Sequence, residues 1–140
     1  MSNRSKLLVV LTSQDILPTR EGVKTGWYLP ELVHPYNVLS PHVDMVFASP
    51  IGGEAPIDPY SIEDSKNDEE CQQFLREKEA LWKDTESLDA IIDRADEFLG
   101  AFFVGGHGRK SSPNGYQLSK QLMILLQPCS TSQMTASPIR

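Results

Sequence analysis

The chain has 140 residues, of which 39% are hydrophobic, and its 13 basic and 19 acidic residues give a formal net charge of −6 at pH 7. This length and composition fit one domain of an ordinary soluble globular protein. The acidic balance argues against nucleic acid as a partner, because phosphate binding needs clustered lysines and arginines. No apolar run reaches the ~20 residues that cross a bilayer, and no secretory signal is recognisable, so we expect a cytoplasmic protein without a membrane partner.

The charged residues divide the chain into two parts. All 19 acidic residues lie in residues 1–108, together with nine basic ones, whereas residues 109–140 contain four basic residues and no acidic one. The second part is rich in Ser, Gln and Thr, a composition typical of disordered segments. We therefore expect one folded part in residues 1–108 and a divergent, disordered tail in residues 109–140.

Strand-like and helix-like segments alternate along the first part. Lys6–Thr12 is a continuous apolar run, typical of a strand buried on both faces of a parallel sheet. Gly26–Leu39 predicts a helix, with Pro30 in its first turn and Pro35 kinking or ending it. Val43–Ala48 alternates as a second strand. Together these segments predict a βαβ unit.

The chain then predicts further helices and a third strand. Residues 49–61 are rich in proline and glycine, which favours an ordered loop or a lid. Apolar residues recur at helical spacing from Asp68 to Trp82, and Ser87 can cap another short helix. Gly100–Val104 is an apolar run that ends in glycines. The predicted fold is α/β, an incomplete parallel sheet of about three strands with flanking helices.

Glu31 is a carboxylate inside an otherwise apolar segment of the first predicted helix. Leu29, Leu32 and Val33 form one face of that helix and would draw Glu31 towards the interior. A partly desolvated carboxylate has a raised pKa and suits acid/base chemistry. The alternative is a glutamate on the solvated face of an amphipathic helix, which the spacing alone favours.

A glycine-rich loop directly follows the third predicted strand. The backbone N–H groups of Gly105 and Gly106 could point at one spot and hold an oxyanion or a carboxylate. A tight turn at the end of a strand explains the two glycines about as well. His107 suits a general base or a ligand, and also a simple loop anchor. Because ligands collect at the carboxyl ends of strands in open α/β sheets, this loop is the candidate site.

The other reactive residue types do not form a recognisable site. Cys71 lies on the apolar stripe of a helix and Cys129 lies in the polar tail, so the sequence offers no nucleophile. His34, His42 and His107 lack the spacing of a zinc site. The glycine loop also lacks the Lys-Ser/Thr ending of a phosphate-binding loop and the spacing of a dinucleotide site. We therefore expect no metal and no cofactor.

Several motifs taken together resemble a known family, the DJ-1/PfpI superfamily, and within it the Hsp31-like branch. The motifs are Leu11–Ser13, Lys24–Pro35, Ala48–Pro50, Gly52-Gly53, Pro56–Pro59 and Phe102–Gly108. The resemblance covers the amino-terminal half of a family domain, from about Lys6 to Gly108. It implies a flavodoxin-like fold of the class I glutamine amidotransferase type.

The resemblance also implies a function and a set of site residues. The activity of the branch is glutathione-independent glyoxalase, also called D-lactate dehydratase, a lyase that detoxifies methylglyoxal to lactate. A chaperone role in stress is attributed to it as well. By motif, Glu31 matches the acid/base glutamate that shares a proton with the nucleophilic cysteine. Gly105 and Gly106 match the glycines of the anion hole, and His107 matches the adjoining loop histidine. The implied partner is a small aldehyde such as methylglyoxal.

After Gly108 the chain departs from the family pattern. The family continues with an apolar, Asp-containing helix start, whereas Arg109–Ser112 follows here, and the nucleophile elbow with its Cys-His pair has no counterpart. We expect a truncated domain whose last 32 residues arise from a changed reading frame or alternative splicing, with glyoxalase activity lost or nearly so. The alternative is a non-enzymatic stress-response or chaperone-like protein. Open sheet edges further predict marginal stability and self-association, for example as a homodimer.

Overall fold

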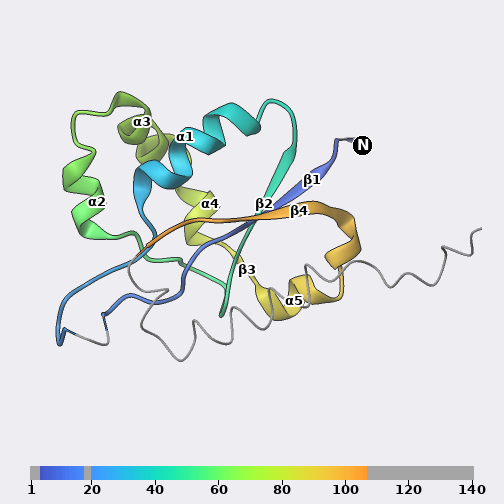
Figure 1. Cartoon of the computed structure of the whole chain (residues 1–140), viewed down its shortest axis with the longest axis horizontal. Helices are drawn as coiled ribbons and strands as arrows, with labels where there is room; N and C mark the ends of the chain where they lie inside the picture. The colour runs from blue at the N-terminus through green and yellow to red at the C-terminus, as the bar shows by residue number, and fades with distance from the viewer. Residues whose placement is uncertain (1–3, 18–19, 107–140) are drawn as a thin grey trace, which may run out of the picture.

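Four parallel strands form one sheet in the computed structural model, which describes residues 4–17 and 20–106 (Figure 1). The strands are β1 (Lys6–Val10), β2 (Asp44–Ser49), β3 (Glu86–Ser87) and β4 (Phe98–Phe103). Their order in the sheet is β3-β2-β1-β4, and all three pairings are parallel. The predicted flavodoxin-like α/β fold is confirmed. The sheet differs from the prediction by the two-residue strand β3 at one edge.

The helices lie on both faces of this sheet. They are α1 (Leu29–Leu39), α2 (Pro59–Asp64), α3 (Glu69–Glu77), α4 (Glu79–Lys83), α5 (Leu88–Ile92) and the 3-10 helix η1 (Ala95–Glu97). Figure 1 shows α1, α2 and α3 grouped above the strands and α5 below them. Among the described residues, no helix combines the length and the apolar character needed to span a membrane.

Strand β1 lies at the centre of the core and is buried on both faces, as its apolar run predicted. Val9 belongs to the cluster that contains the buried residues of α1 and α3, whereas Leu8 and Val10 pack with α5. This alternation follows from the two-residue period of a strand, which turns successive side chains to opposite faces. β1 therefore contributes side chains to the hydrophobic cores on both faces of the sheet.

Local sequence signals explain where the helices begin. Pro30 lies in the first turn of α1, and the side chain of Asp68 caps α3 by accepting hydrogen bonds from the backbone N–H groups of Glu70 and Cys71. The predicted cap of α5 is confirmed, since Ser87 accepts a hydrogen bond from the N–H of Ala90. α1 runs on through Pro35 to Leu39, so the proline does not end the helix.

Candidate functional site

Three backbone segments meet at the carboxyl end of β4, where the glycine loop begins. Val104 continues the pairing of β4 with β1, because its N–H donates to the carbonyl oxygen of Val10 at 3.2 Å. One residue further, the carbonyl oxygen of Gly105 accepts a hydrogen bond of 2.9 Å from the N–H of Tyr28. The strand exit is thereby fixed to the residue that immediately precedes α1.

The segment before α1 is in turn bonded to the loop that leads into α2. The N–H of Trp27 donates to the carbonyl oxygen of Pro56, and the N–H of Asp58 donates to the carbonyl oxygen of Trp27, each at 2.9 Å. These bonds form a parallel bridge between Trp27 and Ile57. The backbone of residues 26–28 is consequently held from both sides, by residues 56–58 and by residues 104–106.

Two glycines are required here because backbones approach each other closely. A Cβ atom at Gly26 would overlap the carbonyl oxygen of Pro56 and lie 2.6 Å from the nitrogen of Asp58. A Cβ at Gly106 would overlap the carbonyl oxygen of Gly26 and lie 3.3 Å from the Cα of Trp27. Real Cβ atoms do not approach backbone atoms this closely, so neither position accommodates a side chain. Close packing therefore explains why position 106 is a glycine. The sequence analysis had considered an anion-binding loop and a tight turn, but not this reason.

Glu31 lies in the first turn of α1 with its carboxylate against Gly105. A Cβ atom at Gly105 would lie 2.9 Å from Cδ of Glu31 and would overlap Oε2. The absence of a side chain at position 105 is thus what gives the carboxylate its place beside the end of β4. The structure brings together Glu31, Gly105 and Gly106, three residues that the motifs singled out. His107 lies outside the described residues.

Glu31 is exposed, so the interpretation that the spacing favoured, a glutamate on the solvated face of the helix, is confirmed, and the expectation that it is drawn into the interior is wrong. α1 buries Leu29, Leu32 and Val33. At 3.6 residues per turn, position 31 lies about 200° around the helix from position 29, on the side opposite this stripe. The carboxylate therefore reaches the glycine loop from the solvent side.

A tyrosine–aspartate pair lies beside this site and joins the start of α1 to the end of α2. The hydroxyl of Tyr28 donates to Oδ2 of Asp64 at 2.7 Å. This hydrogen bond, with smaller contributions from desolvation and from the charge of Asp64, raises the pKa of Tyr28 to about 12. The pair therefore fixes Tyr28, whose backbone N–H donates to the carbonyl oxygen of Gly105.

The Tyr28 pair predicts a loss of stability at alkaline pH. An unfolded tyrosine has a pKa of about 10, so the pair contributes fully below that pH and its contribution disappears as pH rises from about 10 to about 12. We expect Tyr28→Phe to flatten the fall of unfolding free energy in this window, as measured by urea denaturation at a series of pH values. Asp64→Asn should act in the same direction, because it replaces the carboxylate that accepts the hydrogen bond and removes its negative charge. An unchanged slope in both variants would contradict the assignment.

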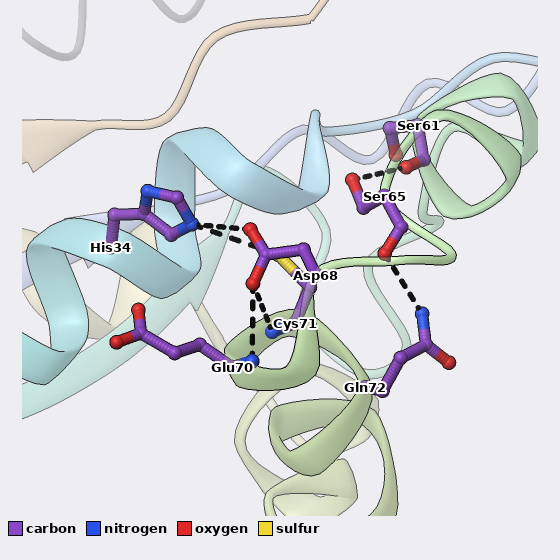
Figure 2. A network of polar contacts seen from close by, with 7 residues as sticks. All are labelled: His34, Ser61, Ser65, Asp68, Glu70, Cys71 and Gln72. Carbon is purple, nitrogen blue, oxygen red and sulfur yellow. Dashed lines mark hydrogen bonds and ion pairs between the residues drawn. The ribbon is translucent and has the colours of Figure 1, made fainter.

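A second polar cluster lies one helical turn further along α1, on the side of α3 (Figure 2). Nε2 of His34 donates to Oδ2 of Asp68 at 2.7 Å, and Sγ of Cys71 lies 4.0 Å from the same Nε2. The hydrogen bond with His34 lowers the pKa of Asp68. Burial, followed by the hydrogen bond and charge of Asp68, raises the pKa of Cys71 to about 11. Cys71 is buried, which agrees with the sequence interpretation.

The sequence analysis missed this cluster as a unit. Asp68 and Cys71 belong to one local signal, because Asp68 is the N-cap of α3 and Cys71, three positions later, lies in its first turn. His34 comes from a different helix, and only the packing of α1 against α3 brings it there. The spacing of the three histidines could not reveal the cluster, because it contains only one histidine, which meets a carboxylate and a thiol.

Comparison with solved structures found proteins that share this fold. Rapid Encystment Protein 24 kDa of Francisella tularensis is 30% identical, with a TM-score of 0.70, and the match covers 86% of this chain and 53% of that protein. Another solved structure is 32% identical, with a TM-score of 0.66, and the match covers 86% and 51% of the two chains. For glyoxalase III of Candida albicans the identity is 24%, the TM-score 0.67 and the coverage 86% and 50%, a likeness of the fold.

The chain spans about half the length of each of these solved structures. Neither the family models nor the curated proteins that were searched gave a match.

Proposed function

Because the chain belongs to the DJ-1/PfpI superfamily and its motifs resemble those of the Hsp31-like branch, we propose that it carries the acid/base half of a glyoxalase-type site. The observation that carries this proposal is the Glu31 carboxylate resting directly on Gly105 at the end of β4. The proposed substrate class is a small 2-oxoaldehyde such as methylglyoxal. The chain also shares its fold with a glyoxalase III, which supports the proposal.

Two observations support a role for Glu31 in proton transfer to a bound aldehyde. Glu31 is exposed, so a small substrate can reach the carboxylate from solvent. The residue beneath it, Gly105, has no side chain, which lets the carboxylate lie directly against the backbone of the strand exit. A positioned carboxylate can take a proton from one carbon of the substrate and return it to the neighbouring one, a step worth typically 10²- to 10⁴-fold in rate.

Turnover also needs a nucleophile that forms a covalent intermediate with the aldehyde. Within residues 4–17 and 20–106 the free cysteine is Cys71, whose thiol packs against His34 and Asp68. With its pKa raised to about 11, on the order of one molecule in ten thousand carries the thiolate at pH 7. We therefore propose that the chain alone converts methylglyoxal no faster than the uncatalysed reaction.

The proposal is tested by supplying the missing thiol from solution. A small thiol adds through sulfur to the aldehyde carbon of methylglyoxal. Glu31 then takes the proton from that carbon and returns it at the adjacent carbonyl carbon, and water hydrolyses the resulting thioester to lactate and free thiol. No external oxidant or reductant is consumed. We expect the purified chain to accelerate lactate formation only when the thiol is present.

Variants separate the role of Glu31 from general effects of the protein. Glu31→Gln should abolish the acceleration, and Glu63→Gln, an exposed carboxylate on α2, should retain it. Equal rates for the chain and for Glu31→Gln in the presence of thiol would remove the acid/base assignment. Glu31-dependent lactate formation without added thiol would instead show that the chain is a complete enzyme.

The alternative, a chaperone-like protein, would act through exposed apolar surface. Large exposed apolar side chains include Val38 on α1, Ile51 in the loop after β2 and Leu99 on β4. They belong to separate elements, and single exposed apolar residues are ordinary on soluble proteins. This function stays a prediction. Suppression of client aggregation by both the chain and Glu31→Gln, without any lactate formation, would favour it.

A further inference from the structure

We propose that His34, Asp68 and Cys71 form a zinc-binding site that joins α1 to α3. One ligand atom from each residue, Nε2, a carboxylate oxygen and Sγ, lies within 4.8 Å of the other two. The site is separate from the Glu31 loop and uses residues that the proposed glyoxalase chemistry leaves idle.

Two helices position the three ligands. His34 belongs to α1, whereas Asp68 and Cys71 are the N-cap and a first-turn residue of α3. Oδ1 of Asp68 is occupied by the N–H groups of Glu70 and Cys71. These bonds fix the carboxylate and aim Oδ2 at His34, as Figure 2 shows. Asp68 is thus held by the helix cap in the orientation that ligation requires.

The distances are close to those of a tetrahedral zinc site. With zinc–ligand bonds of about 2.0 Å to nitrogen and oxygen and about 2.3 Å to sulfur, ligand atoms lie about 3.3 to 3.6 Å apart. Nε2 of His34 and Oδ2 of Asp68 are 2.7 Å apart and would separate slightly, while Sγ of Cys71, at 4.0 Å from Nε2, would approach slightly. Both changes are of the size that side-chain rotation provides.

The mixture of ligand types favours zinc over the common hard cations. Calcium and magnesium prefer shells of oxygen, whereas zinc combines thiolate, imidazole and carboxylate. The His34 side chain is 52% exposed and that of Asp68 31%, so the side of the cluster next to solvent can supply a water as fourth ligand. Cys71 closes the site from the core.

Zinc binding would displace one proton of the cluster, the thiol proton of Cys71. His34 would bind through Nε2 as a neutral imidazole, with its ring proton on Nδ1. A coordinating thiol is deprotonated by the ion itself, so the raised pKa of Cys71 lowers the affinity at neutral pH without preventing ligation. The ion would take the place of the hydrogen bond that now joins α1 to α3.

Metal titration of the full-length chain with reduced thiols tests this site. We expect calorimetry to show one Zn²⁺ per chain, and Co²⁺ as a probe to give the near-ultraviolet charge-transfer band of a thiolate ligand. Cys71→Ser should remove the band and weaken zinc binding at least 10- to 100-fold, because even changes outside the ligand set cost this much. Cys129→Ser, the matched control, should keep both the band and the affinity.

A second variant keeps the test independent of folding. Asp68→Asn retains the helix cap, since asparagine caps as well as aspartate, but it replaces the ligating carboxylate with an amide. We expect native circular dichroism together with zinc affinity at least about tenfold weaker. Absence of zinc binding by the parent chain would overturn the site. A cobalt band that survives Cys71→Ser but disappears in Cys129→Ser would overturn it as well.

Discussion

Replacing Trp27 by alanine is expected to lower the free energy of unfolding by about 3–5 kcal/mol, the range for removing a large aromatic residue from a core. The side chain is fully buried, and its indole N–H donates to the carbonyl oxygen of Ala55 at 3.0 Å. Its ring also meets that of Trp82 edge-on, with 6.3 Å between the ring centroids. The substitution would leave a cavity and a buried carbonyl without its donor.

Urea denaturation followed by circular dichroism measures this loss. Because small domains are stable by only about 5–15 kcal/mol, Trp27→Ala should unfold at markedly lower urea concentration. Val38→Ala removes an apolar side chain that is 68% exposed and should change the midpoint little. Similar midpoints for the two variants would contradict the burial of Trp27.

Replacing Gly26 by alanine should cost about 3 kcal/mol, the upper end of the usual range for an added methyl group in a packed core. The new Cβ would overlap the carbonyl oxygen of Pro56, a backbone atom that cannot rotate away. Relief of this overlap requires residues 26–28 to separate from residues 56–58, with loss of the two hydrogen bonds between them.

Gly100→Ala provides the matched control for the same chemical change. A Cβ at Gly100 would lie 4.0 Å from Cδ1 of Leu7, an ordinary contact with the end of a side chain. We expect Gly100→Ala to change the unfolding free energy by less than about 0.5 kcal/mol. Equal destabilisation by the two alanines, in parallel denaturant titrations, would show that residues 26–28 do not pack as described.

The sequence contained enough information for most of the fold. The apolar run of β1 and the alternation of β2 predicted their burial, and Ser87 marked the start of α5. β3 could not be predicted, because Glu86 and Ser87 show no strand pattern and pair only because β2 lies beside them. The division of the predicted 68–82 helix at Lys78 has no glycine or proline to announce it.

The sequence predicted which residues form the candidate site, but it predicted their arrangement only in part. Helical periodicity places Glu31 opposite Leu29, and this spacing already favoured the exposed position that the structure shows. The contact of Gly106 with Gly26 could not, because 80 positions along the chain separate the two residues and only the completed fold brings them together. The cluster of His34 with Asp68 and Cys71 depends on helix packing in the same way.

Lactate formation from methylglyoxal in the presence of a small thiol, compared between the chain and Glu31→Gln, tests most directly whether Glu31 acts as the acid/base group. The account predicts a rate at least about tenfold higher for the unaltered chain, the lower part of what positioned proton transfer provides. Identical rates for the two proteins, with both folded by circular dichroism, would contradict it.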